Sequence, residues 1–550
     1  MLSGLPVAAA AVAAQATVAP SAILTPMTTR HLPDEVAEGR AHFVRAMDAS
    51  RPLKFAVSLP VRDPRGLEKL FHEVSDPASP RYRQYLDGAQ FNERFAPSRE
   101  DYEAVLRWAE ASGFRLRGGS ANRRVVALEG SVGDIDRAFD VAMTEYQHPT
   151  EDRTYFSPDR EPAARGLAVA LLHVTGLQDF MRPGRHMARA PEGAPASLGG
   201  TGPKGSFTPT DMRKAYYGNG ALDGAGQTVG VFSFDGYLAS DLDLYYSTLN
   251  WHPTVPVKNV LVNGFSGTCQ KPCDDGEQIL DMTNVIGMAP GLTQLLFYEG
   301  ENDVEILNKM ATDNKAKILS SSWYWRADAS AIDPIFQQMG VQGQTFVNAT
   351  GDKGAFNSKT YDFPGVDPYI LQVGGTQVTI SGGAWSSETS WAQQSQGGAS
   401  GGGYYKGTPI PSWQKTAGVI TAANGGSTKL RNSPDVAAES SFNSSTVVNG
   451  KFETGWGGTS FGAPRWAGYL ALANQQAALN GKPPVGFVDP TLYTIGLGAS
   501  FTTDFHDIKT GNNRPTEGTG SGFDAVKGYD LVTGWGSPNG ANLLNALAGN

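Results

Sequence analysis

The sequence predicts an α/β protein in which a mostly parallel sheet with helices on both faces follows a smaller α+β domain. The chain has 550 residues, which exceeds the size of one ordinary domain. Its charge is unevenly placed, because residues 1–190 hold 24 Lys+Arg and 24 Asp+Glu whereas the remainder holds 21 and 30. Beyond residue 205, short apolar segments alternate with helical patterns, which is typical of a parallel sheet.

The first domain alternates strands with helices over residues 51–147. The hydrophobic periodicity predicts strands over 53–59 and 124–131 and helices over 65–74, 102–110 and 132–139. This order predicts a small sheet covered by helices on one face. Residues 187–205, rich in Ala, Pro, Gly and Ser, follow as a flexible linker, where a proteolytic cut would leave packed structure intact.

The second domain contains a glycine-rich turn that leads into an apolar helix. Buried strands are expected over 227–234, 294–298, 316–322 and 345–350, and an Ala/Leu-rich helix over 465–473. Ser460 lies in Gly458-Thr459-Ser460 at the start of this helix, where free backbone N–H groups favour negative charge. Ser460 is therefore a candidate nucleophile beside an oxyanion site, and a helix-capping serine is the alternative.

Histidine is a poor candidate for the base that would activate Ser460. Only His252 and His506 follow the linker, and neither lies in a Gly/Thr-rich setting typical of a catalytic histidine. Glu277 and Asp281 are four residues apart in a helix expected from residue 275, so they share one face. If buried, the two carboxyls would share a proton, and a solvated acidic face is the alternative.

A third carboxyl follows a predicted strand. Asp352 comes directly after the strand that ends at Thr350, so we expect it at the carboxyl edge of the parallel sheet, where α/β enzymes place their sites. Taken alone, Gly351-Asp352-Lys353-Gly354 equally fits an ordinary turn.

These motifs together resemble one family of peptidases. Gly458-Thr459-Ser460-x-x-Ala463-Pro464 resembles the nucleophile motif of subtilisin-like enzymes, and Glu277, Asp281 and Asp352 precede it in the order found in sedolisins, the serine-carboxyl peptidases that include kumamolisin. Residues 75–86 and 90–98 resemble that family's activation prodomain. The resemblance implies a ferredoxin-like prodomain over 35–186, the linker over 187–205 and a subtilisin-like catalytic domain over 206–550.

The resemblance also implies a mechanism and a mode of control. Ser460 would attack the peptide carbonyl, Glu277 would act as base, Asp281 would orient Glu277, and protonated Asp352 would stabilise the oxyanion. We expect an acid-active serine-type endopeptidase acting on proteins and peptides. It would be made as a zymogen whose prodomain inhibits in the same chain and is released when acid protonates carboxylates at the interface. An exopeptidase and an inactive binding protein on this scaffold are the alternatives.

Oxygen-bearing residues near the C-terminus resemble the family's calcium site. Asp507 and Asp530 would supply carboxylates, and Ile508, Val526 and Gly528 would supply backbone carbonyls, which are ligands that Ca²⁺ prefers. Val526 stands where the family usually has glycine. We expect one structural calcium ion, and a metal-free Asp-rich turn is the alternative.

Three further features bear on localisation and on partners. The apolar run 5–14, within residues 1–25, resembles a signal-peptide core and is too short to span a bilayer. Cys269 and Cys273 are the only cysteines, and a small disulfide loop would favour an oxidising compartment. The acidic, charge-sparse second domain argues against nucleic-acid and membrane partners. We therefore expect a secreted monomer.

Overall fold

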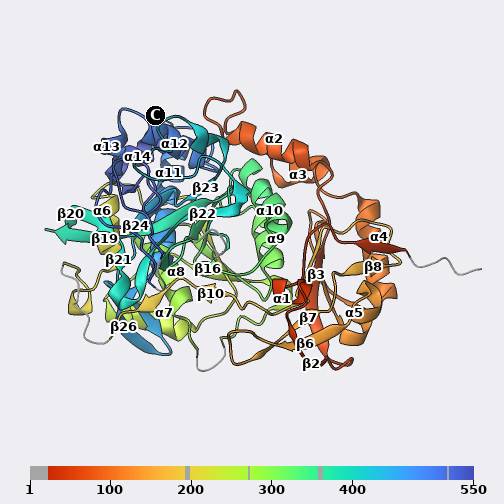
Figure 1. Cartoon of the computed structure of the whole chain (residues 1–550). Helices are drawn as coiled ribbons and strands as arrows, with labels where there is room; N and C mark the ends of the chain where they lie inside the picture. Colours follow the sequence, from red (N-terminus) through yellow and green to blue (C-terminus); the bar gives the residue numbers. More distant parts are fainter. Residues whose placement is uncertain (1–22, 192–198, 270–272, 357–362, 517–519, 550) are drawn as a thin grey trace, which may run out of the picture.

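The computed structural model describes residues 23–191, 199–269, 273–356, 363–516 and 520–549. It has a smaller lobe, red to orange in Figure 1, and a larger lobe that runs from yellow to blue. Nearly all of the expected signal peptide lies outside the described residues. In the part of the chain that the structure describes, no helix combines the length and the apolarity needed to cross a membrane.

The smaller lobe is built on an antiparallel sheet with the strand order β4-β5-β3-β9. Its core joins these strands to two helices, through residues such as Phe55, Trp108 and Phe139. The resulting βαββαβ order is the ferredoxin-like arrangement. The elements are β3 (Pro52–Ser58), α2 (Pro64–Ser75), α3 (Gly88–Arg94), α4 (Arg99–Ala111), β4 (Arg115–Gly119), β5 (Val125–Ser131), α5 (Val132–Phe139) and β9 (His173–Thr175).

Smaller elements surround this sheet. Strand β1 pairs with β8, so residues 24–26 pack on the same lobe, before the expected start of the prodomain at residue 35. A second sheet has the order β2-β6-β7. The elements are β1 (Leu24–Pro26), α1 (Asp34–Ala37), β2 (His42–Ala46), β6 (Met143–Gln147), β7 (Thr154–Pro158) and β8 (Ala163–Arg165).

The larger lobe contains an eight-stranded sheet with the order β13-β14-β12-β15-β17-β19-β20, in which β24 also pairs with β19. Every pairing is parallel except that of β19 with β20. The predicted α/β class is therefore confirmed. The strands are β12 (Thr228–Ser233), β13 (Val257–Leu261), β14 (Gln294–Glu299), β15 (Ile318–Ser321), β17 (Thr345–Ala349), β19 (Leu371–Ser381), β20 (Ala384–Ser390) and β24 (Val436–Glu439).

Helices cover both faces of this sheet. Successive strand residues point to opposite faces and pack in two different hydrophobic clusters. Phe297 packs in the cluster that contains residues of α8 and α11, whereas Leu296 and Tyr298 pack in the cluster that contains α9 and α10. Both faces being buried explains why these strands are apolar throughout. The helices are α6 (Pro209–Tyr216), α7 (Ala239–Thr248), α8 (Gly276–Met288), α9 (Asp303–Asp313), α10 (Ala329–Val341), α11 (Thr459–Leu479), α12 (Asp489–Gly496), α13 (Phe501–Asp504) and α14 (Gly540–Ala548).

Helix α2 of the smaller lobe packs against α10 of the larger lobe (Figure 1). The Phe71 ring lies 5.1 Å from the Tyr369 ring and 4.9 Å from the Phe487 ring, measured between centroids. Asn122 donates hydrogen bonds to Asn308 at 2.8 Å and to Gln338 at 2.9 Å, with all three side chains buried. The apolar core therefore continues from one lobe into the other.

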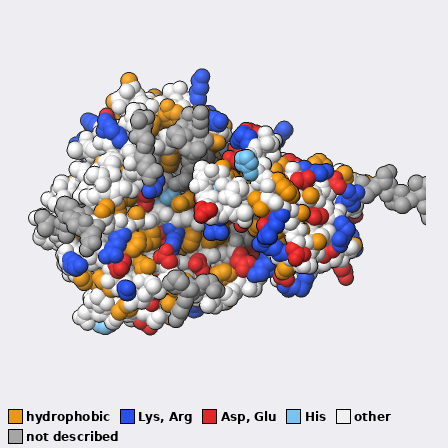
Figure 2. Space-filling view, turned by 60° about the horizontal axis from the view of Figure 1, so that its bottom comes forward, with side chains coloured by type: hydrophobic (Ala, Val, Ile, Leu, Met, Phe, Trp, Pro, Cys, Tyr) orange, Lys and Arg blue, Asp and Glu red, His pale blue; other side chains and the backbone are white. Residues whose placement is uncertain are grey.

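The charge difference seen in the sequence is also visible on the surface. Figure 2 shows acidic and basic side chains crowded together on the smaller lobe, whereas uncharged atoms dominate much of the larger lobe. Two differently composed units are thus joined in one molecule.

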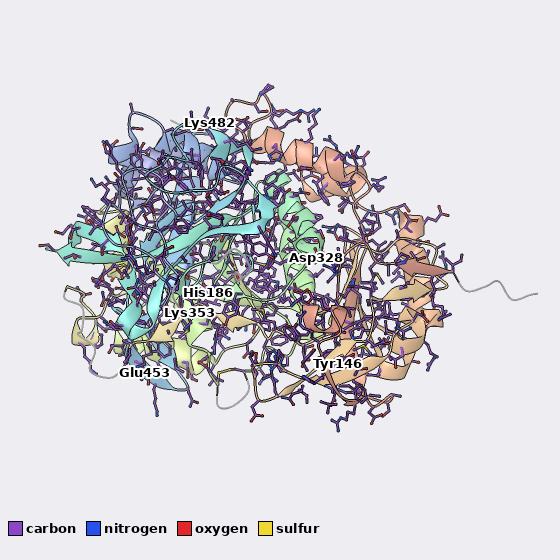
Figure 3. The ribbon with its side chains drawn as sticks, viewed as in Figure 1. Tyr146, His186, Asp328, Lys353, Glu453 and Lys482 are labelled. Atoms are coloured by element: carbon purple, nitrogen blue, oxygen red, sulfur yellow. A yellow bond between two sulfur atoms is a disulfide. The ribbon has the colours of Figure 1, made fainter. Side chains whose placement is uncertain are left out.

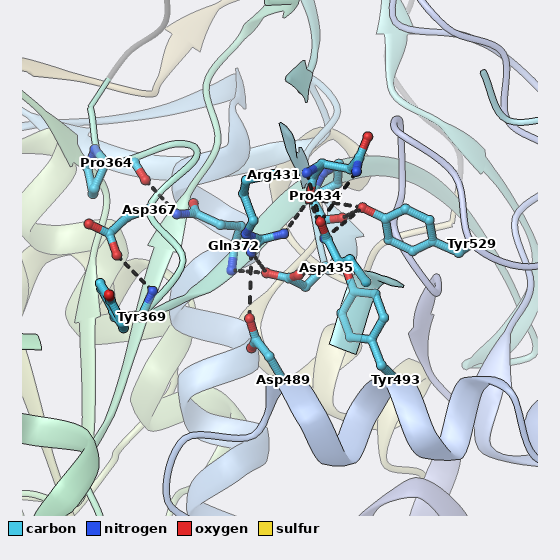
Figure 4. A network of polar contacts seen from close by, with 12 residues as sticks. Pro364, Asp367, Tyr369, Gln372, Arg431, Pro434, Asp435, Asp489, Tyr493 and Tyr529 are labelled. Atoms are coloured by element: carbon cyan, nitrogen blue, oxygen red, sulfur yellow. Dashed lines mark hydrogen bonds and ion pairs between the residues drawn. The ribbon is translucent and has the colours of Figure 1, made fainter. Parts of the chain in front are cut away.

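A buried ion network ties β23 (Leu430–Ser433) to α12 (Figure 4). The Arg431 guanidinium lies 2.6 Å from a carboxylate oxygen of Asp435 and 3.6 Å from one of Asp489, and all three side chains are fully buried. The Tyr493 hydroxyl donates to Asp435 at 2.9 Å. Burial lowers the pKa of Arg431, but the two carboxylates outweigh it and leave that pKa above its usual value. Each carboxylate therefore shares a compensating cation.

Candidate active site

The structure extends the linker toward the N-terminus, and its residues 184–189 run through the larger lobe as two short strands. Strand β10 (Gly184–Arg185) pairs antiparallel with β16 (Trp323–Tyr324), and β11 (Ala188–Arg189) pairs antiparallel with β26 (Lys451–Gly457). His186 lies between them, and Figure 3 shows it inside the larger lobe, away from Tyr146 of the smaller lobe. The linker is therefore bound on both sides of His186 as an added strand.

The carbonyl of His186 points at Ser460. The Ser460 backbone N–H donates a hydrogen bond to it at 3.0 Å, and the His186 N–H donates to the Ser322 carbonyl at 3.2 Å. Ser460 is fully buried in the first turn of α11, and its hydroxyl donates to the Ser322 carbonyl at 3.4 Å. Gly458 has φ 140°, and a Cβ there would lie 2.1 Å from the His186 carbonyl oxygen. Only glycine allows this close approach.

Glu277 and Asp281 occupy successive turns of α8, at 0 % and 1 % exposure. The Ser322 hydroxyl donates to Asp281 at 2.6 Å. Among the described residues, neither carboxyl oxygen of Glu277 has a partner at good hydrogen-bonding geometry. Burial, followed by the neighbouring Asp281, raises the pKa of Glu277 well above its usual value, while the Ser460 hydroxyl lowers it. Burial likewise raises the pKa of Asp281. The predicted pair is thus buried beside Ser460.

Asp352 follows β17 at the carboxyl edge of the sheet, as expected, and is 6 % exposed. One carboxyl oxygen accepts from the Thr459 N–H at 2.8 Å and from the Thr459 hydroxyl at 2.9 Å. The other would lie 2.7 Å from a Cβ at Gly458, the same place that the His186 carbonyl oxygen approaches. The structure therefore brings Ser460, Glu277, Asp281 and Asp352 together near one peptide carbonyl.

The two histidines considered as alternative bases lie elsewhere. His252 is exposed and contacts Asn250 at 3.2 Å, and the His506 ring stacks on Trp385 with centroids 3.8 Å apart. The histidine nearest to Ser460 is His186, which sequence reasoning placed in the prodomain and gave no role. Its ring is buried, lies 4.8 Å from the Tyr324 ring, and has a pKa that burial lowers to about 3. It is therefore unsuited to act as a base at ordinary pH.

Comparison with known proteins agrees with this geometry. Residues 40–180 match the family model described as "Pro-kumamolisin, activation domain", and residues 274–485 match "Subtilase family". Kumamolisin of Bacillus sp. (strain MN-32) is 31 % identical over 520 residues, which cover 90 % of this chain and 92 % of that protein. The chain belongs to the sedolisin family. It is a serine-carboxyl peptidase of the kumamolisin type, made as a zymogen with an activation domain.

Other relatives also align with nearly the whole chain. Sedolisin of Pseudomonas sp. (strain 101) is 29 % identical over 99 % of this chain and 96 % of its own length. Human tripeptidyl-peptidase 1 is 26 % identical over 561 residues, which cover 94 % of this chain and 94 % of that protein. The solved structure of Pseudomonas sedolisin in complex with pseudo-iodotyrostatin aligns with a TM-score of 0.54 at 28 % identity, covering 64 % of this chain and 100 % of that chain.

The residues expected to bind calcium lie in two segments, 507–508 and 526–530, that hydrogen bonds join. The Val526 N–H donates to Asp530 at 3.0 Å, and the Gly528 N–H donates to Asp507 at 3.0 Å. Asp530 is fully buried, and burial raises its pKa to about 7 despite several hydrogen bonds. Within the described ranges, no group of three or more His, Cys, Asp or Glu side chains could hold a metal ion. A site here would therefore need the backbone carbonyls as well as the two carboxylates, an all-oxygen set that fits Ca²⁺.

The two cysteines lie close together. The sulfur atoms of Cys269 and Cys273 are 2.13 Å apart, and residues 270–272 between them lie outside the described residues.

Proposed function

We propose that this sedolisin is an acid-active endopeptidase with Ser460 as nucleophile, Glu277 as general base, Asp281 as the residue that positions Glu277, and Asp352 as an oxyanion stabiliser. The observation that supports this most strongly is the hydrogen bond from the Ser460 N–H to the His186 carbonyl. This contact presents a peptide carbonyl to the hydroxyl of Ser460 with Glu277 and Asp352 close by. It is the arrangement expected of a bound substrate.

The reaction follows from these positions. Ser460 Oγ attacks the carbonyl carbon while its proton passes to Glu277. The carbonyl oxygen becomes an oxyanion and accepts hydrogen bonds from the Ser460 N–H and from protonated Asp352. The C–N bond then breaks as Glu277 returns the proton to the leaving amine, and water releases the acyl group by the same steps in reverse.

The types of catalytic residue predict that the enzyme is most active at acidic pH. A carboxyl base ordinarily titrates near pH 4, below the value of about 6.5 for histidine. Asp352 can donate a hydrogen bond only while protonated. Activity should therefore be highest in acid and should fade as Asp352 loses its proton.

The prodomain, in this proposal, blocks the site through the linker and is removed by cleavage between His186 and Met187. The pairing of β10 with β16 and of β11 with β26 holds residues on both sides of this bond. The bond lies at the border between the prodomain and the linker expected from the sequence, at residues 186 and 187.

Acid would release the linker by protonating the buried His186. His186 is held neutral with a pKa of about 3, whereas a free histidine titrates near 6.5. Binding of the linker is thus fully stabilised above pH 6.5 and weakens as the pH falls toward 3, by about 3 kcal/mol at pH 4. Asp303 acts in the opposite direction, because burial raises its pKa to about 6. His186 is therefore proposed as a trigger in addition to the interface carboxylates expected from the sequence, among which Asp274 and Glu453 form ion pairs with Arg185 and Arg189.

Calcium would complete the loop at residues 526–530, held by Asp507, Asp530 and the carbonyls of Ile508, Val526 and Gly528. When bound, the ion supplies positive charge and rigidity. The ion would stabilise the charged form of the Asp530 carboxylate, which burial without a cation makes unfavourable. Secretion, a monomeric state and a Cys269–Cys273 disulfide belong to the same proposal, and the sulfur separation supports the last.

One experiment tests the proposed function. Purified full-length protein and Ser460→Ala are incubated with casein from pH 2 to pH 8, and the fragments are sequenced. We expect wild type to digest casein internally in acid and to yield a mature chain beginning at Met187, while Ser460→Ala stays intact. Release of tripeptides alone would indicate an exopeptidase, and equal digestion by Ser460→Ala would refute the nucleophile.

A further inference from the structure

Arg185 lies one residue before the carbonyl that faces Ser460. If the bond after His186 is the one cleaved, His186 occupies position −1 of a substrate and Arg185 occupies position −2. Arg185 is held there by pairing with Trp323 across β10 and β16. The linker therefore shows which groups of the catalytic domain would meet a substrate side chain at position −2.

These groups form an acidic and aromatic subsite. The Arg185 guanidinium donates to both the backbone carbonyl and the carboxylate of Asp274. The same guanidinium carbon lies 5.9 Å from the centroid of the Trp323 ring, within cation–π range. The Arg185 side chain is only 25 % exposed, so most of it is covered by the catalytic domain.

The charge of Arg185 also affects the pKa of two further carboxyls. Burial raises the pKa of Asp235, and the charge of Arg185 opposes this rise. The charge of Arg185 likewise opposes the burial that raises the pKa of Glu277. A neutral or acidic residue at position −2 would remove this favourable charge and leave Asp274 without its ion-pair partner.

Asp274 is attached to a well-anchored segment. It follows Cys273, whose sulfur is within bonding distance of Cys269, and precedes the buried Asp275. Asp275 accepts a hydrogen bond from the Leu238 N–H at 2.9 Å at the start of α8. Asp274 and Trp323 both belong to the catalytic domain, so the subsite remains after the linker has left.

We propose that the catalytic domain selects a basic residue, arginine above lysine, at position −2 of its substrates through Asp274 and Trp323. The proposal rests on the proposed function and names its substrate class. Arginine is favoured because its planar group can reach a carbonyl and a carboxylate together while lying on a ring, which lysine cannot do. Because Asp274 is 58 % exposed, solvent screens this pair, and the contact corresponds to about three- to tenfold in binding.

The test uses mature enzyme and internally quenched peptides that copy residues 182–190. Only position −2 varies, as Arg, Lys, Gln or Glu, and kcat/KM is measured for wild type, Asp274→Asn and Glu453→Gln. Glu453 is the matched control, because it pairs with Arg189 at 3.1 Å on the other side of the bond. We expect wild type to cleave the Arg peptide about three- to tenfold better than the Gln peptide. Asp274→Asn should lose most of this ratio, and Glu453→Gln should keep it.

A charge reversal guards against a variant that merely fails to fold. Asp274→Lys should turn the preference toward the Glu peptide. The proposal is overturned if active wild type cleaves the Arg and Gln peptides within twofold of each other, or if Asp274→Asn keeps the ratio. Failure of wild type to cleave every peptide and casein would instead refute the proposed function, so the two failures are distinguishable.

Discussion

The larger lobe contains two buried carboxylate clusters that differ in one respect. Asp435 and Asp489 share the cation of Arg431, whereas Glu277 and Asp281 have hydroxyl neighbours, Ser460 and Ser322. In the first cluster Arg431 offsets part of the cost of burying Asp489, whose pKa is still raised by burial and by Asp435. In the second, burial raises the pKa of both carboxyls, and the neighbouring Asp281 raises that of Glu277 further. The difference lies in the partner, because a fully buried cation holds the first cluster together, whereas the second lies beside the hydroxyl that is proposed to give up its proton.

Replacing the base should give the largest effect. Glu277→Gln removes the proton acceptor while keeping the side-chain shape, so kcat should fall about 10⁴-fold or more. Because this variant would not process itself, it is activated by tagged wild-type enzyme that is then removed, and casein hydrolysis is measured. Asp243→Asn, a change of an exposed carboxylate on α7, is the control and should keep full activity. Substantial activity in Glu277→Gln would end the contrast between the clusters.

Removing the cation should convert the stable cluster into an unstable one. Arg431→Met leaves Asp435 and Asp489 buried without a counter-charge, so the free energy of unfolding should fall by about 3–5 kcal/mol. Urea unfolding of the inactive Ser460→Ala zymogen measures this change. Arg514→Met is the control, since Arg514 and Asp524 form an exposed pair and its loss should cost less than about 1 kcal/mol. Equal stability of the two variants would show that Arg431 does not compensate the cluster.

The oxyanion role of Asp352 is tested by two substitutions that differ in hydrogen bonding. Asp352→Ala removes the donor, and kcat should fall by about 10²–10³. Asp352→Asn keeps a donor at every pH, so it should lose less activity and should stay active nearer neutrality than wild type. The pH dependence of kcat on a peptide substrate measures both. If the Asn variant loses activity at the same pH as wild type, a group other than Asp352 controls the fall.

A third buried site, that of the Asp530 carboxylate, extends the comparison because its cation would be supplied from solution. Removing calcium with a chelator should lower the free energy of unfolding by about 3 kcal/mol, if the ion was present at 100 times its dissociation constant. Thermal unfolding with and without chelator measures this loss. Asp530→Asn should unfold at one temperature under both conditions. An unchanged wild-type midpoint would contradict the calcium proposal.

The smallest effect concerns the pH dependence of stability. The pKa of Glu277 is raised in the folded state, so its contribution to stability is present below its unfolded pKa and is lost as the pH rises through its folded pKa. Glu277→Gln in the Ser460→Ala zymogen should therefore match its parent near pH 4 and exceed it increasingly toward pH 7. Thermal unfolding across this range measures the difference. A constant difference between the two proteins would contradict a raised pKa.

Much of the fold could be predicted from sequence because its signals are local. Apolar runs predicted β12, β14, β15 and β17. The four-residue spacing of Glu277 and Asp281 predicted that both lie on one face of a helix. The family resemblance added the order of the candidate site residues. These predictions needed only neighbours along the chain or a known motif.

The remaining features depend on how distant segments meet. Nothing near His186 in the sequence indicates that its carbonyl reaches Ser460, since that contact follows from the path of the linker. The pairing of Arg185 with Asp274 likewise joins separate segments. Arg431 and Asp435 stand four residues apart in a strand and turn, and sequence gives no sign that α12 brings Asp489 to them.

The contact between α2 and α10 has a consequence for the enzyme after activation. Phe71 belongs to the same apolar cluster as Val341 and Phe487, so departure of the prodomain uncovers a surface that was solvent-free during folding. We expect the mature enzyme to depend on the height of its unfolding barrier more than on its equilibrium stability. Heat inactivation of the mature enzyme should accordingly be irreversible, while the intact precursor recovers on cooling.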